Sequence, residues 1–157
     1  MGRGPGLIPG RELPVCPGSG EATAMDLVER YVALWKETGA DARRKAIELL
    51  WHEDGVHLLQ PPREMRDRAI ALGFGDAVLA ARGYAAIEER VRRGYEDFLA
   101  PAGVTLRAGG NTDRLGDTVK FNWELVDGSG QLRSTGLEVL TLAADGRIAV
   151  DHQFFES

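Results

Sequence analysis

The stretch LWHEDGVHLL at residues 50–59 contains two histidines and two acidic residues, the side chains that bind metals and transfer protons. In the zinc motif H-E-x-x-H, the histidines are four residues apart and share one face of a helix. Here His52 and His57 are five residues apart, which is roughly 140° around a helix, and Gly55 between them disfavours a continuous helix. The spacing therefore predicts no metal site.

The same residues instead predict a boundary between two elements. A helix ends near Trp51, the backbone turns through residues 53–55, and a short strand begins at Val56 and is closed by two prolines. We expect His52 to cap the helix C-terminus at the surface, and Asp54 to hydrogen-bond the backbone of the turn.

A second group of ionisable side chains lies near the C-terminus, in LEVLTLAADGRIAVDHQFFE. Asp145-Gly146 predicts a two-residue hairpin turn, which pairs Glu138 with Gln153 and Leu140 with Asp151. One face of this hairpin then carries Glu138, Leu140, Leu142, Asp151, Gln153 and Phe155. The other face carries Leu137, Val139, Val150, His152 and Phe154. The second face is a candidate dimer surface, with His152 as an interface histidine.

Glu138 and Asp151 would be diagonal neighbours on the first face, about 5–8 Å apart. Two carboxylates in an apolar cup do not both ionise readily, so the pKa of one should rise. The protonated acid can then donate to a developing oxyanion, and its partner can accept a proton. The alternative is that both carboxylates point into water from an open sheet.

The elements that position these groups are helices first and strands afterwards. Apolar residues at helical spacing predict a first helix through Met25, Val28, Tyr31, Val32 and Trp35. They also predict a second helix with Asp41 as its N-cap, and a third from Tyr84 to Phe98 that Pro101 ends. In the third helix, the mixed charges of EERVRR at 88–93 are typical of a solvated face.

The last third of the chain changes to the alternation of strands. In VKFNWEL the apolar positions are Val119, Phe121, Trp123 and Leu125, which we expect on a pocket or core wall. Helices followed by a sheet indicate the α+β class. Residues 63–83, which Gly73 and Gly75 interrupt, are either a lid or padding at a pocket mouth.

Length, composition and net charge limit the class of protein. A chain of 157 residues that is 43% apolar suits one domain, predicted at 23–157. Ten of the first 24 residues are Gly or Pro, so we expect 1–22 to be a flexible leader. A net charge of -5 argues against a nucleic-acid partner, and no apolar run is long enough for a membrane span. The single cysteine, Cys16, excludes an internal disulfide and fits a cytoplasmic location.

The stretches ERYVALWKETGADA, LWHEDGVHLL, GYAAIEERV and LEVLTLAADGRIAVDHQFFE occur in an order that resembles the nuclear-transport-factor-2-like (NTF2-like) superfamily. That superfamily includes ketosteroid isomerases, SnoaL-like polyketide cyclases and limonene epoxide hydrolase. The resemblance implies a cone, in which a curved antiparallel sheet wraps around three or four helices and encloses a pocket. It also implies a homodimer.

The resemblance assigns roles to particular residues. Tyr31 falls at the tyrosine that donates to the oxyanion in ketosteroid isomerases, and Glu138 falls at their acid. The position of their general base reads Leu59, or Gln60, so the usual base is missing. His57 lies on the same strand face as Leu59 and could replace it.

The expected function is cofactor-free acid/base chemistry, an isomerase or cyclase reaction on an apolar carbonyl compound, without a metal. The catalytic candidates are Tyr31, His57, Glu138 and Asp151. The ligand-binding candidates are Trp35, Leu59, Phe121, Trp123, Leu140, Gln153 and Phe155. One alternative is a ligand-binding or interaction domain without catalysis. Another is an epoxide hydrolase, for which Arg107 and Arg133 lack an evident pair of acids.

Overall fold

The computed structural model describes residues 23–73 and 78–156; the predicted leader at 1–22 lies outside them. The helices of the N-terminal half are α1 (Ala24–Leu34), α2 (Ala40–Leu50) and α3 (Arg63–Ala71). The third predicted helix is α4 (Gly83–Arg93), which continues through the π-helical turn η1 (Gly94–Leu99) into α5 (Ala100–Ala102). All three predicted helices are therefore present, and α3 lies in the stretch whose structure the sequence left open.

The first two helices bury the faces that their periodicity predicts. Thr23 and Asp26 form a capping box at the start of α1, and Tyr31 on its inner face is 1% exposed. Met25 was expected on that face but is 52% exposed, in the first turn of the helix. The predicted N-cap Asp41 is also wrong, since α2 begins at Ala40, two residues earlier than that cap implies, and Gly39 occupies the cap position.

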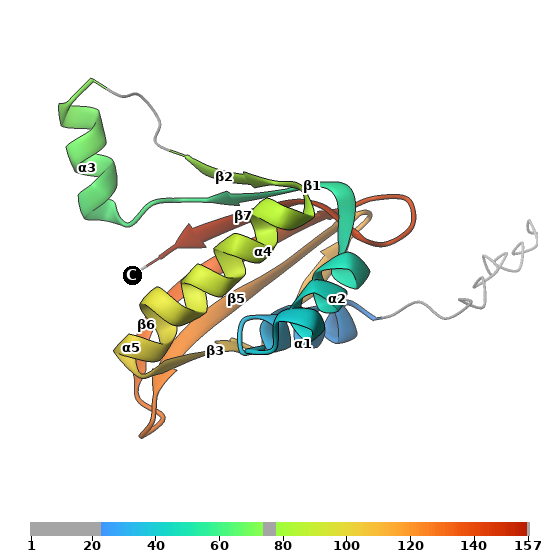
Figure 1. The fold of residues 1–157 in the computed structure, drawn as a ribbon, viewed down its shortest axis with the longest axis horizontal. Coiled ribbons are helices and arrows are strands. Elements are labelled where there is room, and N and C mark those ends of the chain that lie inside the picture. Colours follow the sequence, from blue (N-terminus) through green and yellow to red (C-terminus); the bar gives the residue numbers. More distant parts are fainter. Residues whose placement is uncertain (1–22, 74–77, 157) are drawn as a thin grey trace, which may run out of the picture.

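Seven strands form one curved sheet (Figure 1). They are β1 (Trp51–Leu59), β2 (Leu79–Arg82), β3 (Val104–Ala108), β4 (Asp113–Leu115), β5 (Thr118–Asp127), β6 (Leu132–Leu142) and β7 (Ile148–Phe155). The order is β2-β1-β7-β6-β5-β3, with β4 paired to β5. The predicted α+β fold is confirmed. One pair departs from the expected antiparallel sheet: β1 runs parallel to β7, so the sheet is mixed.

Figure 1 shows α1, α2 and α4 against the inner face of the sheet, while α3 projects beyond one end. α3 buries none of its residues. Among the described residues, no helix is long and apolar enough to cross a lipid bilayer.

The stretch 50–59 folds differently from its prediction. The helix does end there, at Leu50, but β1 starts immediately at Trp51, and its pairing with β7 is irregular between Trp51 and Val56. His52 does not cap the helix; its Nδ1 accepts the Asp54 N–H at 3.2 Å within the irregular segment. Gly55 is required because a Cβ there would lie 2.8 Å from the carbonyl oxygen of His52.

The β6–β7 hairpin has the predicted register around the ionisable residues, for an unexpected reason. Glu138 pairs with Gln153 and Leu140 with Asp151, as predicted. The loop, however, has three residues rather than two, because the Ala143 N–H bonds the carbonyl of Arg147 and Gly146 takes a positive φ of 84°. A bulge between Thr141 and Leu142 then shifts the pairing back by one residue.

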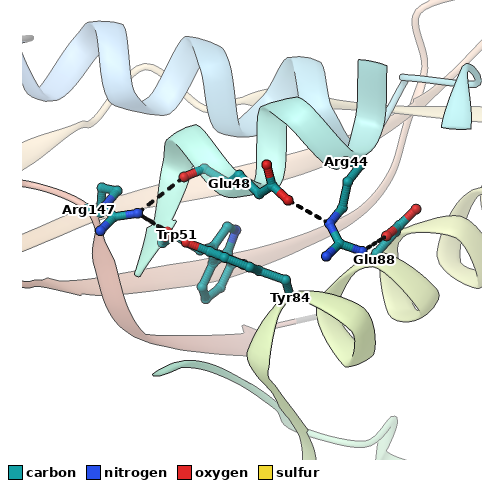
Figure 2. A network of polar contacts seen from close by, with 6 residues as sticks. All are labelled: Arg44, Glu48, Trp51, Tyr84, Glu88 and Arg147. Carbon is teal, nitrogen blue, oxygen red and sulfur yellow. Dashed lines mark hydrogen bonds and ion pairs between the residues drawn. The ribbon is translucent and has the colours of Figure 1, made fainter. Parts of the chain in front are cut away.

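A polar network ties this loop to two helices (Figure 2). Arg147 Nη1 donates to the Tyr84 hydroxyl at 3.0 Å, and Tyr84 donates to the Trp51 carbonyl at 3.1 Å. Arg44 on α2 bonds Glu88 on α4 at 3.0 Å. These contacts hold the start of β1 between α2 and α4, and β1 carries His57.

Candidate functional site

Four ionisable side chains from four different elements meet inside the cone. Tyr31 comes from α1, His57 from β1, Glu138 from β6 and Asp151 from β7. Each is buried, with at most 1% of its surface exposed. The parallel pairing of β1 with β7 places His57 directly beside Asp151, and the hairpin register brings Glu138 to the same face. Neither carboxylate points into water, which was the alternative that the sequence left open.

The Tyr31 hydroxyl lies between the two acids, 2.8 Å from Glu138 Oε1 and 2.7 Å from Asp151 Oδ2. A hydroxyl has one proton to donate, so both contacts are hydrogen bonds only when one carboxyl is itself protonated. Burial, followed by the neighbouring Asp151, raises the pKa of Glu138 well above its usual value. Glu138 is therefore the group that keeps a proton and donates to Tyr31, which in turn donates to Asp151. Burial first, and then both acids, also raise the pKa of the Tyr31 hydroxyl.

Arg90 on α4 determines the tautomer of His57. Its Nη1 lies 3.2 Å from His57 Nδ1 and 3.0 Å from the His57 carbonyl, so one N–H is shared between these two acceptors while the other bonds the Leu79 carbonyl. A guanidinium has no acceptor, so a proton on Nδ1 would face another N–H, and the fitting tautomer has the lone pair on Nδ1 and the proton on Nε2. That Nε2–H points at Gln153 Oε1, 2.9 Å away. Burial lowers the pKa of His57, and the charge of Arg90 lowers it further, against the opposing effect of Asp151. His57 is thus a neutral hydrogen-bond donor, an arrangement that does not favour the predicted role of a base.

The same tautomer bears on metal binding. Donor atoms of His57, Glu138 and Asp151 lie within 4.8 Å of one another, a spacing that could suit a cation. A metal would need the Nε2 lone pair, yet Arg90 on the opposite nitrogen keeps Nε2 protonated. The Tyr31 hydroxyl also takes the position between the two acids. The donor set therefore suits shared protons better than a metal ion.

An apolar cavity of about 390 Å³ adjoins this cluster. It lies between the α4–η1 helix and the inner face of the sheet, and five predicted ligand-binding residues line it: Trp35, Leu59, Trp123, Gln153 and Phe155. The other two, Phe121 and Leu140, do not line it; both are 0% exposed. They were assigned by strand parity, which gives the face of a residue but not its depth in the cone.

None of the four catalytic candidates lines the cavity. Gln153 is the link, because it lines the cavity and accepts the hydrogen bond from His57. The buried cluster is therefore one layer behind the cavity wall. A larger hollow of about 610 Å³ lies between α3 and the C-terminal ends of β1 and β7, with His152 and Phe154 in its wall. It contains none of the four, and the helix that forms it buries no residue of its own.

Arg90 and Gly94 are among the cavity residues that sequence reasoning missed. Arg90 was assigned to a solvated helix face, but it is half-buried and lines the cavity. The available signal was its spacing, three residues after Ile87 and one before Val91, which borders the apolar face of α4. Gly94 begins the π-helical turn, where a Cβ would lie 2.7 Å from the ring of Trp35, so only glycine lets this helix approach so closely.

The base position of the ketosteroid isomerases carries no acid in this fold. Leu59 lines the cavity, and Gln60 Oε1 accepts the backbone N–H of Phe155 at 3.1 Å. Arg107 and Arg133 form ion pairs with Glu124 and Asp127, and both arginine side chains are more than half exposed. Neither arginine therefore supports the epoxide hydrolase alternative.

No family model matches the chain, and no curated protein does. Solved structures match over most of its length. A putative isomerase of the SnoaL-like family from Agrobacterium tumefaciens has a TM-score of 0.68 at 20% identity, covering 85% of this chain and 97% of that one. An NTF2-like protein of unknown function from Exiguobacterium has a TM-score of 0.53 at 18% identity, covering 83% and 98%.

A third similar structure is a protein with a ketosteroid isomerase-like fold from Catenulispora acidiphila, in complex with trimethylamine. It has a TM-score of 0.52 at 17% identity and covers 83% of this chain and 85% of that one. The class that the fold defines is the NTF2-like α+β cone, as the sequence resemblance predicted. Within that class, this chain is similar in fold to SnoaL-like and ketosteroid isomerase-like proteins.

Proposed function

We propose that this domain binds a small, largely apolar molecule in the cavity between α4–η1 and the sheet. The observation that supports the proposal is the cavity itself, about 390 Å³ with almost entirely apolar walls and only two lining residues with charged or amide groups, Arg90 and Gln153. Pockets for small molecules are typically about 300–1,000 Å³, mostly apolar, with a few polar groups that orient the ligand.

Filling the cavity should abolish this binding. Leu106 on β3 lines the cavity and is 4% exposed, so the indole in Leu106→Trp would occupy the space. We expect the neutral fluorescent probe N-phenyl-1-naphthylamine to bind the wild type and to bind Leu106→Trp at least about tenfold more weakly. Leu115→Trp is the matched control, because Leu115 is 85% exposed. Equal probe affinity in all three proteins, with unchanged circular dichroism, would contradict the proposal.

A second candidate function is acid/base catalysis on an apolar carbonyl compound, as an isomerase or cyclase. The shared proton of Glu138, Tyr31 and Asp151 favours it, since one acid can donate while the other accepts. The neutral tautomer of His57 makes Asp151 the better proton acceptor. The substrate would reach these groups by displacing Gln153 or Trp35 from the cavity wall, so the reaction depends on ligand binding there.

Exchange of α-protons provides a direct test of catalysis. We expect the wild type to speed deuterium uptake at the methyl group of 2-acetonaphthone in D2O, followed by proton NMR, and Asp151→Asn to slow it by about a hundredfold or more. Glu124→Gln on the outer face of β5 is the control and should behave as wild type. Exchange by the wild type at the rate of buffer alone would leave ligand binding as the function.

The homodimer also stays a proposal. Leu137, Val139, Val150, His152 and Phe154 share the outer face of β6 and β7, and Phe154 is 39% exposed. An apolar strip of this kind suits a second copy of the chain, and a monomer mass in sedimentation equilibrium would exclude the dimer.

The cytoplasmic location rests on Cys16 alone and is likewise a prediction.

A further inference from the structure

The charged and amide groups of the cavity wall are all oriented as hydrogen-bond donors. Arg90 has no acceptor, so it makes His57 Nδ1 accept, and His57 then donates through Nε2 to Gln153 Oε1. With its carbonyl oxygen engaged, Gln153 has its amide N–H groups left for a ligand. Trp35 and Trp123 line the same cavity with their rings, while their indole N–H groups are buried and have no acceptor within the described part of the chain.

Arg90 also brings a positive charge that no described side chain neutralises at close range. Within residues 23–73 and 78–156, no carboxylate lies within 4.0 Å of its guanidinium, whereas Arg92 and Arg93 on the same helix both pair with Glu89. Nη1 donates to the backbone carbonyls of His57 and Leu79, both at 3.0 Å, which anchors one end of the group. Nε and Nη2 make no hydrogen bond to the described residues and remain available.

We propose that the cavity takes an apolar carboxylic acid as its anion, with Arg90 as counter-ion and the Gln153 amide as second donor. This inference rests on the proposed function, because it names the chemical class of the ligand at the same site. A carboxylate is the acceptor that a guanidinium binds most strongly, through two parallel N–H groups. Glu138 and Asp151 behind the cavity wall do not exclude an anionic ligand. Glu138 retains a proton, and His57 and Gln153 lie between the two acids and the cavity.

A cationic ligand fits these walls less well, although aromatic rings often bind cations. Four aromatic residues line the cavity: Trp35, Trp123, Phe98 and Phe155. A cation placed among them would face Arg90, and it would find no side-chain acceptor because the Gln153 carbonyl is engaged by His57. Repulsion and the unmet hydrogen bonds of the ligand would both weaken its binding.

Four naphthalene probes that differ in one substituent separate these cases by isothermal titration calorimetry at neutral pH. They are 2-naphthoate, 2-acetonaphthone, 2-ethylnaphthalene and 2-naphthylmethylammonium. We expect 2-naphthoate to bind about tenfold tighter than the two neutral probes or better, and the ammonium to bind most weakly. Arg90→Met should weaken the binding of 2-naphthoate until its affinity equals that of 2-ethylnaphthalene. Arg92→Met, on the exposed side of α4, should leave the affinities of both probes unchanged.

Gln153→Glu gives a second test that does not depend on Arg90→Met folding. It replaces a donor by an anionic acceptor and should reverse the preference, so that the ammonium binds tighter than 2-naphthoate. If the wild type binds 2-ethylnaphthalene and 2-naphthoate equally, or prefers the ammonium, the inference is overturned while the apolar binding site stands. If none of the four probes binds, both the inference and the proposed function are overturned.

Discussion

Gly136→Ala is expected to lower the free energy of unfolding by at least about 3 kcal/mol, which is more than most single-methyl additions cost. Gly136 lies in the middle strand of three, opposite Trp123 on β5 and Phe155 on β7. A Cβ at this position would overlap the indole ring of Trp123 and the backbone carbonyl of Phe154. The carbonyl belongs to a paired strand and cannot move away, and the indole of Trp123, which is 1% exposed, can yield only into the cavity.

Urea unfolding followed by circular dichroism measures this cost. Because Trp123 also lines the cavity, Gly136→Ala should weaken the binding of N-phenyl-1-naphthylamine in whatever fraction stays folded. The control is Gly128→Ala in the β5–β6 turn, where an added Cβ meets no atom within 4 Å. We expect it to shift stability by less than about 0.5 kcal/mol. Similar unfolding midpoints for the two variants would show that β6 is not packed as described.

Glu138→Gln should remove much of the loss of stability that the wild type suffers as pH rises. Folding raises the Glu138 pKa well above its usual value of 4.5, through burial and then the neighbouring Asp151. Between 4.5 and the raised folded pKa, the folded state holds a proton that the unfolded state has released. This contribution to stability is complete below pH 4.5 and is lost as pH rises through the folded pKa. Within that window the slope is about -1.4 kcal/mol per pH unit.

The contribution of His57 to stability changes with pH in the opposite direction. The effect of Glu138 is therefore measured as the difference between wild type and Glu138→Gln. Its folded pKa is lowered from 6.5 by burial and by Arg90, so stability is lost as pH falls below 6.5 and the unfolded chain gains a proton. Both proteins contain His57, and the difference between wild type and Glu138→Gln therefore isolates Glu138. Glutamine at 138 resembles the protonated acid in shape and can still donate to Tyr31.

Urea unfolding free energies between pH 4.5 and 9 provide the measurement. The stability of Glu138→Gln relative to wild type should increase steadily with pH over the window of the Glu138 titration. Glu53→Gln, at an exposed position on β1, is the control and should give a curve parallel to that of wild type. A constant difference between Glu138→Gln and wild type across this range would mean that Glu138 ionises normally, and the shared proton would be excluded.

Much of the fold could be predicted because the signals for it are local. Helical spacing in 25–35 and alternation in 119–125 identified the buried faces of α1 and β5, including Tyr31 and Trp123. The register of β6 with β7 was also predicted, although the loop length was wrong. The three-residue loop and the bulge beside Thr141 shift the pairing by one residue in opposite directions, so Glu138 and Asp151 still share a face.

Only the family resemblance suggested that Tyr31 joins Glu138 and Asp151. The sequence by itself determined the α+β class, most of the helix and strand faces, and the placement of Glu138 and Asp151 on one face of a hairpin. These follow from periodicity and residue type, which act over a few neighbouring residues. Only the tertiary structure decided that this cluster lies behind the cavity wall, that Arg90 turns inward, and that His57 is therefore a donor. Depth, side-chain direction and tautomer depend on contacts between α4, β1 and β7, and residues such as Arg90 and Gln153 that make these contacts are 63 positions apart in the chain.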